Sequence, residues 1–192
     1  MKIYLEHISK RFQRHWIFKD VHLNFNAPGA YAILGPNGSG KSTLLRIIAG
    51  MQSPSAGKMV YENNVTPLPL EQLYHHVSFT APSQEIVEEF TLAEFLQFHF
   101  SFKPIYPGLD VQQVINITGL QDAQHKPIGD YSSGMKQLVK LAQALVHGPR
   151  LLFLDEPTSA LDPGGRRTVR RLLEELRGRG IAILLNSHLL TE

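Results

Sequence analysis

The stretch ILGPNGSGKSTLL, residues 33–45, places three glycines, one lysine and several hydroxyl side chains between two apolar runs. The run YAILG at its start is typical of a short buried strand that ends at glycine. The segment STLLRIIAG at its end spaces leucines and isoleucines along one face of a helix, and Gly50 suits the position just past a helix end. The sequence therefore predicts a strand, a glycine-rich loop and the start of a helix.

The loop fits the pattern G-x-x-x-x-G-K-[ST] through Gly35, Gly40, Lys41 and Ser42. Glycines let the backbone curl around a phosphate chain with its N–H groups pointing inward, and the helix start adds the positive end of its dipole. Lys41 offers a charge to the outer phosphates, and the Ser42 hydroxyl offers a ligand to Mg²⁺. A glycine-rich hairpin is the structural alternative, but the flanking strand and helix favour a nucleoside triphosphate cradle. The residues expected to line it are Gly35, Pro36, Asn37, Gly38, Ser39, Gly40, Lys41, Ser42 and Thr43.

A second candidate site lies in LLFLDEPTSALD, where Asp155 and Glu156 end an apolar strand. One edge of the predicted sheet should bring both carboxylates near the phosphate loop. We expect Asp155 to be the outer-shell partner of Mg²⁺, and Glu156, which points the other way, to polarise a water for attack on the γ-phosphate. His188 follows another apolar strand, IAILLNSH, and should reach the same edge. The alternatives, an acid pair that only starts a loop and a structural histidine, are disfavoured by these positions.

Length and composition limit what the rest of the chain can be. With 192 residues and 43% hydrophobic content, the chain can bury the core of one domain, with an inserted subdomain at most. The formal net charge of +2 gives no strong field of one sign, so no nucleic-acid partner is expected. The absence of cysteine excludes disulfides and thiolate metal sites. No apolar run approaches the roughly 18–20 residues that cross a bilayer, and the N-terminus lacks a signal peptide's apolar segment, so the chain is expected to be cytoplasmic.

The order of these patterns predicts an α/β fold. Strand patterns dominate up to about residue 80, helical patterns follow up to about residue 146, and strand patterns return with LLFLDEP. The fold class expected is a P-loop NTPase core with an N-terminal antiparallel β region and an inserted helical subdomain. The expected boundaries are one domain over 1–192, with the ATP-binding core at approximately 1–80 and 148–192 and the helical subdomain at approximately 85–147.

Aromatic side chains gather in the helical block. They could form a surface that binds a partner, but aromatic residues in a helical subdomain are usually buried, so we predict that they belong to its core. The residues concerned are Phe90, Phe95, Phe98, Phe100, Phe102 and Tyr106.

A further motif, YSSGMKQ at 131–137, is similar to the signature usually written LSGGQ. It begins a predicted helix shortly before the LDE strand. On this motif together with the phosphate loop, the chain resembles the ATP-binding-cassette (ABC) ATPases, the nucleotide-binding subunits of ABC transporters, over essentially its whole length. The resemblance implies that Ser132 and the backbone of Gly134, at a helix N-terminus, bind the γ-phosphate of the ATP held by a partner subunit.

The resemblance assigns roles to further residues. The segment SALD, which ends at Asp162, resembles the D-loop that crosses the dimer interface. Phe12 in ISKRF matches the aromatic residue that stacks on adenine. The resemblance also implies that Glu156 is the catalytic base and that His188 is the γ-phosphate switch, with ATP and Mg²⁺ as the ligands.

The sequence departs from the family pattern in two places. Tyr131, Ser133 and Met135 replace the leucine, the first glycine and the glutamine of the usual signature. In FTAPSQEIVEEFT the glutamine that normally ligates Mg²⁺ and senses the membrane subunit is displaced. An ungapped match puts Pro82 at its position, whereas a small shift would put Ser83 or Gln84 there, and we choose Gln84.

The function implied is that of an ATP-hydrolysing transporter subunit, and the compact length resembles small exporter subunits. Two copies would sandwich two ATP molecules head to tail, most simply as a homodimer, and the helical subdomain would pass the motion to a transmembrane permease. The expected location is the cytoplasm, peripherally on the inner face of the cell membrane. The alternatives are a soluble ABC ATPase in DNA repair, translation or iron–sulfur assembly, and a P-loop kinase. The absence of a heptad array and of a second cassette disfavours the first, and Glu156 beside the signature disfavours the second.

Overall fold

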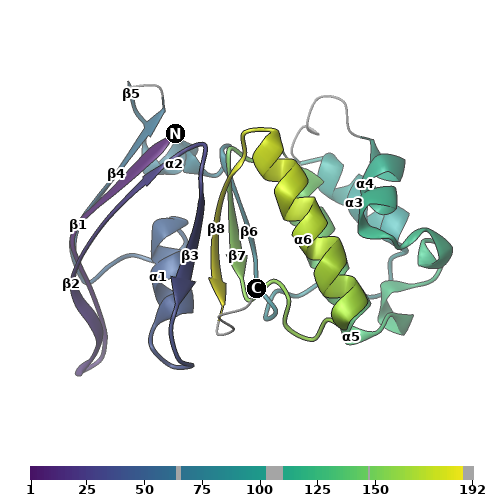
Figure 1. The fold of residues 1–192 in the computed structure, drawn as a ribbon, viewed down its shortest axis with the longest axis horizontal. Helices are drawn as coiled ribbons and strands as arrows, with labels where there is room; N and C mark the ends of the chain where they lie inside the picture. Colours follow the sequence, from purple (N-terminus) through teal and green to yellow (C-terminus); the bar gives the residue numbers. More distant parts are fainter. Residues whose placement is uncertain (64–65, 103–109, 147, 188–192) are drawn as a thin grey trace.

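The computed structural model describes residues 1–63, 66–102, 110–146 and 148–187 (Figure 1). Its strands are β1 (Lys2–Phe12), β2 (His15–Asn26), β3 (Ala30–Leu34), β4 (Ala56–Asn63), β5 (Thr66–Pro67), β6 (Val77–Thr80), β7 (Leu151–Asp155) and β8 (Ala182–Ser187). Its helices are α1 (Lys41–Ile48), α2 (Leu70–Leu73), α3 (Leu92–Phe100), α4 (Val111–Thr118), α5 (Ser133–Val146) and α6 (Pro163–Gly178), with 3₁₀ turns at Gln121–Ala123 and Ile128–Asp130.

The strands form two separate sheets. The first is antiparallel, in the order β2-β1-β4-β5, and contains the N-terminal hairpin. The second has the order β3-β8-β7-β6, and all of its pairs are parallel. The carboxyl ends of β3, β8 and β7 therefore meet along one edge, because parallel strands point the same way.

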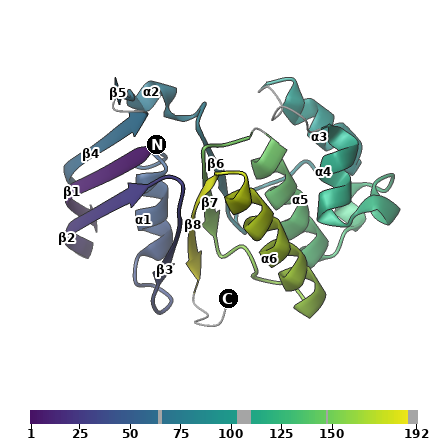
Figure 2. The same ribbon diagram turned by 45° about the horizontal axis from the view of Figure 1, so that its top comes forward.

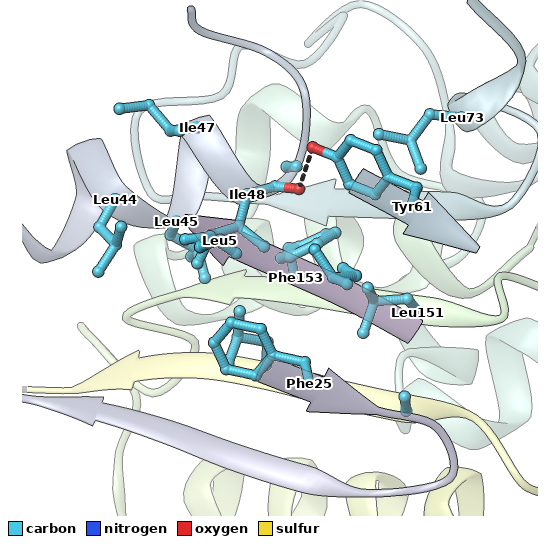
Figure 3. Packing of buried hydrophobic residues seen from close by; sticks show 14 of the residues in the cluster. Leu5, Phe25, Leu44, Leu45, Ile47, Ile48, Tyr61, Leu73, Leu151 and Phe153 are labelled. Carbon is cyan, nitrogen blue, oxygen red and sulfur yellow. Dashed lines mark hydrogen bonds between the residues drawn. The ribbon is translucent and has the colours of Figure 1, made fainter. Parts of the chain in front are cut away.

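Helix α1 lies between the two sheets (Figures 1 and 2). Leu45 and Ile48 are fully buried and pack in one cluster with Leu5 of β1 and Phe153 of β7 (Figure 3). The Tyr61 hydroxyl, from β4, donates a hydrogen bond of 3.0 Å to the Ile48 carbonyl at the end of this helix. Apolar packing on both sides therefore fixes the position of the helix that follows the glycine-rich loop.

The parallel sheet is covered on both faces. Along β7 the side chains alternate, so that Leu151 and Phe153 face α1 while Leu152 and Leu154 pack against α5 and α6. All five residues of β7 are buried, as expected for a central parallel strand. Helix α6 presents Val169, Leu172 and Leu176 to this second cluster.

The helical part between β6 and β7 has its own apolar cluster, built from α3, α4 and α5. Two of its helices begin with capping boxes, Thr91 with Glu94 in α3 and Asp110 with Gln113 in α4. Such reciprocal hydrogen bonds satisfy backbone donors that a helix start leaves open. Helix α4 then ends at Gly119, which has a left-handed backbone.

The predicted fold class is confirmed, including the antiparallel N-terminal region and the parallel sheet around the phosphate loop. The short helix α2 was not predicted, because it spans only four residues and directly follows the proline-containing segment with Pro67 and Pro69. The prediction that the aromatic side chains are buried holds for Phe95 but is wrong for Phe98 and Phe102, which are 45% and 69% exposed. Tyr106 lies outside the described residues. Within the described ranges, none of the helices combines the length and apolarity that a bilayer crossing demands.

Replacing Phe153 by alanine should lower the free energy of unfolding by about 3–5 kcal/mol, since a fully buried ring between α1 and the parallel sheet would leave a cavity. The matched control is Phe102→Ala, at a side chain that is 69% exposed, which should change it by less than about 0.5 kcal/mol. Urea unfolding followed by circular dichroism measures both. Equal losses in the two variants would contradict this account of the core.

Candidate nucleotide site

The glycine-rich loop joins β3 to α1 in a left-handed backbone path. Gly38 and Gly40 have φ values of 79° and 92°. At Gly40 a Cβ atom would clash with Cγ2 of Ile17 on β2, so the loop and the hairpin touch where only glycine fits. In the part of the chain that the structure describes, no side chain caps α1 at this position, and the N–H groups of its first turn face the loop. The loop residues Pro36, Asn37, Gly38 and Ser39 are exposed, as a phosphate site requires.

Lys41 is the first residue of α1, and its side chain reaches back to this loop. It is only 7% exposed, and its ammonium donates hydrogen bonds to the carbonyls of Gly35, at 2.8 Å, and Pro36, at 3.0 Å. A buried ammonium needs such partners, because desolvation of a cation is costly. The charge is therefore held within the curl of the loop, where an anion would meet it.

Ser42 and Asp155 meet across the gap between α1 and β7. The Ser42 hydroxyl donates a 2.8 Å hydrogen bond to Asp155 Oδ1. Asp155 faces α1 because it continues the alternation of Leu151 and Phe153 along β7. The structure thus brings the strand aspartate next to the loop serine, while their role as metal ligands stays a prediction.

Asn186 is a third member of the hydrogen-bond network of Ser42 and Asp155, and the sequence analysis did not identify it. Its Nδ2 donates to Asp155 Oδ1 at 2.7 Å and to Ser42 Oγ at 3.3 Å, while its Oδ1 accepts from the Glu156 N–H at 2.7 Å. The side chain is fully buried and lies beside Asp155 in the β7–β8 register. A lone amide within the apolar strand AILLNS is the signal that could have identified it.

Glu156 follows Asp155 with a left-handed backbone, φ 49°. The turn is fixed by two hydrogen bonds from its own N–H to the carbonyl and side chain of Asn186, at 3.2 and 2.7 Å. A non-glycine residue in this region is uncommon and is held there by its surroundings. The turn places Glu156 directly after the end of β7, next to Asp155. His188, predicted at the same edge, lies outside the described residues.

The donor set fits a magnesium nucleotide. Ser42 and Asp155 supply hydroxyl and carboxylate oxygens, the hard ligands that Mg²⁺ prefers, and the loop supplies N–H groups and an ammonium for phosphate oxygens. Among the described residues, this network contains no histidine and no sulfur ligand.

The motif YSSGMKQ lies at the start of α5. The Ser132 hydroxyl accepts a hydrogen bond of 3.2 Å from the Met135 N–H, so it caps this helix. At Gly134 a Cβ atom would come 3.2 Å from the Ala160 carbonyl, which shows that the motif packs on the following SALD segment. Tyr131 is buried in the helical cluster, donates to the Ala123 carbonyl at 2.7 Å, and burial raises the pKa of its phenol.

Asp162 caps the N-terminus of α6. Its Oδ1 accepts a 2.7 Å hydrogen bond from the Gly165 N–H at the start of α6, which is the position of an N-cap. Together with Ser132 and Gly134 it lines a cavity of about 640 Å³. The signature motif and the SALD segment thus form one continuous surface within a single chain.

Phe12 ends β1 at the tip of the hairpin and is 48% exposed. The Lys10 ammonium lies 5.1 Å from the centre of its ring, a cation–π contact. An exposed aromatic ring of this kind can stack on a nucleobase. Whether it does so stays a prediction.

Gln84 lies after β6 and contacts the helical part. Its Nε2 donates to Gln143 Oε1 of α5 at 3.0 Å, and its own Oε1 is buried without a hydrogen-bond partner among the described residues. The metal-ligand role chosen for Gln84 therefore stays a prediction. The alternative Ser83 accepts a long contact of 3.5 Å from Arg46 Nη2 of α1.

A groove of about 580 Å³ lies between the residues that directly follow α1, Ala49 and Gly50, and the helical part. Gln84, Gln143 and His99 line it, and burial lowers the pKa of His99 so that its imidazole is neutral near pH 7. The large exposed side chains that also line it are Met51, Leu70, Tyr74, Phe98 and Phe102. This groove explains the exposure of two aromatic residues that the sequence suggested to be core.

The fold and the site together define a P-loop NTPase: a parallel sheet, a glycine-rich loop at a helix start, and a strand carboxylate bonded to the loop serine. A profile of the ABC transporter family matches residues 18–159. The chain therefore belongs to the ABC transporter family.

Comparison with known proteins gives several relatives of this family. The chain is 36% identical to an uncharacterized ABC transporter ATP-binding protein, YxlF, of Bacillus subtilis (strain 168), over 97% of this chain and 62% of the relative. It is 30% identical to the lantibiotic transport ATP-binding protein SrtF of Streptococcus pyogenes, over 98% and 80%. It is 33% identical to the Nod factor export ATP-binding protein I of Rhizobium johnstonii, over 96% and 60%. The chain thus spans less than two thirds of two of these three relatives.

A solved structure has the same fold. The dimeric, post-hydrolysis structure of the ATP-binding cassette MJ0796 with ADP and Pi superimposes with a TM-score of 0.83, at 24% identity, over 98% of this chain and 88% of that one. At this identity the likeness establishes the fold.

Replacing Asn186 by alanine should lower the free energy of unfolding by about 1–3 kcal/mol, because buried polar groups of Asp155 and Glu156 lose a partner. Asn186→Asp should cost more, since it places a second carboxylate beside Asp155. The control is Asn116→Ala on the exposed face of α4, with a change below about 0.5 kcal/mol. Denaturant unfolding measures all three variants, and wild-type stability of Asn186→Ala would disprove the bridging role.

Proposed function

We propose that the chain binds and hydrolyses Mg-ATP as the ATP-binding subunit of an ABC transporter. The observation that carries the proposal is the network in which Ser42, Asp155 and Asn186 join the phosphate loop to the β7 edge. The family membership supports ATP as the nucleotide. Mg²⁺ bound by Ser42 and Asp155 would neutralise charge on the phosphates.

The side chains divide the work as follows. Lys41 and the loop N–H groups hold the outer phosphates. Glu156, the residue after Asp155, orients and deprotonates the attacking water. His188, which follows β8 in the sequence, is the residue proposed to contact the γ-phosphate. Phe12 stacks on the adenine.

A second copy of the chain completes the site in this proposal. Ser132 and Gly134 open a helix of 14 residues whose N-terminus favours anions. Because the same surface includes the SALD segment up to Asp162, a head-to-tail partner would meet both motifs at once. The homodimer is the simplest arrangement of this kind.

A transmembrane permease is the partner proposed for the groove beside Gln84. Exposed Phe98, Phe102 and Met51 offer apolar anchors. The buried Oε1 of Gln84, which has no hydrogen-bond partner among the described residues, offers an acceptor. The family supports a membrane partner, and two relatives are named for lantibiotic transport and Nod factor export. We therefore propose export, with the chain peripheral on the cytoplasmic face of the membrane.

The variant Glu156→Gln should bind Mg-ATP within a few-fold of wild type but hydrolyse it about 10²–10⁴ times more slowly, because the base is lost while the cradle remains. Lys41→Ala should instead weaken ATP binding about 10–100-fold through loss of a charged hydrogen-bond donor. Phosphate release and nucleotide titration separate the two effects.

The control for this pair is Glu89→Gln, at an exposed carboxylate in the segment before α3, which should leave both measurements unchanged. Near-normal turnover of Glu156→Gln would remove Glu156 from the role of base. Unchanged nucleotide affinity of Lys41→Ala would count against the phosphate loop itself.

Phe102→Asp should abolish co-extraction of a multi-span membrane protein with the tagged chain, since a charge would enter the apolar groove. ATP binding should stay intact. The control, Gln112→Asp on exposed α4, should leave the complex whole. Gentle detergent extraction with mass spectrometry measures the ratio of the two proteins. Recovery of soluble partners alone would favour the soluble ABC ATPases instead.

A further inference from the structure

Three metal-ligating side chains meet on β1 and β2, among residues that the nucleotide site does not use. His7 Nδ1 lies 2.7 Å from Asp20 Oδ1, and His22 Nε2 lies 3.2 Å from the same oxygen. The ligand atoms of all three residues lie within 4.8 Å of one another, and the two imidazole rings pack edge to face at 4.2 Å. All three side chains are exposed.

Two β-bulges create this cluster. Between the pairs Leu5–Leu23 and Ile8–Val21, two residues of β1, Glu6 and His7, lie opposite one residue of β2. Between Ile8–Val21 and the pair of Lys10 with Phe18, two residues of β2 lie opposite one of β1. Each bulge keeps the flanking apolar residues on the core face and leaves two consecutive polar residues outside. His7 and Asp20 are the second residues of the two bulges.

The backbone at both positions is set before any ligand arrives. His7 and Asp20 have φ values of 54° and 56°, which are uncommon for residues other than glycine. Close packing holds this path, because a Cβ atom at Gly57 of β4 would clash with the His7 carbonyl. The Asp20 N–H donates a 2.9 Å hydrogen bond to Ser9 Oγ. The cluster is thus built on sheet strands rather than on a loose loop.

The donor set is one that first-row transition metals prefer. Two imidazole nitrogens and one carboxylate oxygen are frequent ligands of Zn²⁺ and its neighbours, with about 2.0–2.2 Å from metal to ligand. The hydrogen bond from His7 lowers the pKa of Asp20, followed by that from His22, so its carboxylate is ionised near neutral pH. Exposure leaves room for water to complete the coordination shell.

We propose that His7, Asp20 and His22 form a binding site for a divalent transition-metal ion such as Zn²⁺, which fastens β1 to β2. The competing explanation is a hydrogen-bonded trio that pairs the strands without a metal. The proposal is independent of the ATPase function and shares no residue with it.

The test is titration of the nucleotide-free full chain with Co²⁺, with Mg²⁺ in excess to occupy oxygen sites. The wild type should bind one Co²⁺ with visible absorption bands of a site containing nitrogen ligands, and Zn²⁺ should displace it. His7→Ala and His22→Ala should each weaken binding at least about tenfold, by loss of one ligand of three. Asp20→Asn keeps the shape and an acceptor oxygen but removes the charge, and should weaken binding as well.

Two controls address histidines elsewhere. His15→Ala, at the exposed start of β2, and His75→Ala, at an exposed position shortly after α2, should bind Co²⁺ as the wild type does. Zn²⁺ should raise the melting temperature of the wild type but not of Asp20→Asn, whose folding circular dichroism verifies. Absence of Co²⁺ binding by the wild type, or binding that only the controls weaken, would overturn the proposal.

Discussion

The site depends on the hydrogen bonds made by the side-chain amide of Asn186. It donates to Asp155 and Ser42 and accepts from the Glu156 N–H, at a position with no exposed surface. Three elements, α1, β7 and β8, therefore share one set of hydrogen bonds at the edge where the parallel strands end. An amide can do this because it offers both donors and an acceptor, whereas a carboxylate or an aliphatic side chain would leave a buried group unpaired.

Helix α1, which carries Ser42, connects this hydrogen-bond network to the rest of the fold. Helix α1 begins at the phosphate loop and ends where the Tyr61 hydroxyl meets the Ile48 carbonyl, between two sheets that both pack on it. The groove beside Gln84 includes Ala49 and Gly50, directly after this helix. In the proposed function, the nucleotide at one end of α1 and the partner at the other would both contact this buried helix or the residues next to it.

Much of the fold and the carboxylate edge could be predicted because their signals are local. The alternation of Leu151, Phe153 and Asp155 places the last of them on the α1 side, and a lone polar residue in β8 obeys the same rule. The exposure of Phe98 and Phe102 could not be predicted, because composition does not say which side of α3, or of the turn after it, meets a neighbour. The bulges could not be predicted either. Each places two apolar residues three positions apart in a strand, and this spacing is also typical of a helix.

The N-terminal hairpin packs against the phosphate loop through two residues of β2 that precede its bulge. Ile17 and Phe18 of β2 press on Gly40, where a Cβ atom would clash with Ile17 and come 3.2 Å from the Phe18 ring. Asp20 follows two residues later, at the bulge that turns Lys19 and Asp20 outward and Phe18 inward. The path of β2 therefore fixes how closely it approaches the loop. A metal ion held by His7, Asp20 and His22 would act on that same strand, because it would fix the bulge that directs Phe18 toward the phosphate cradle.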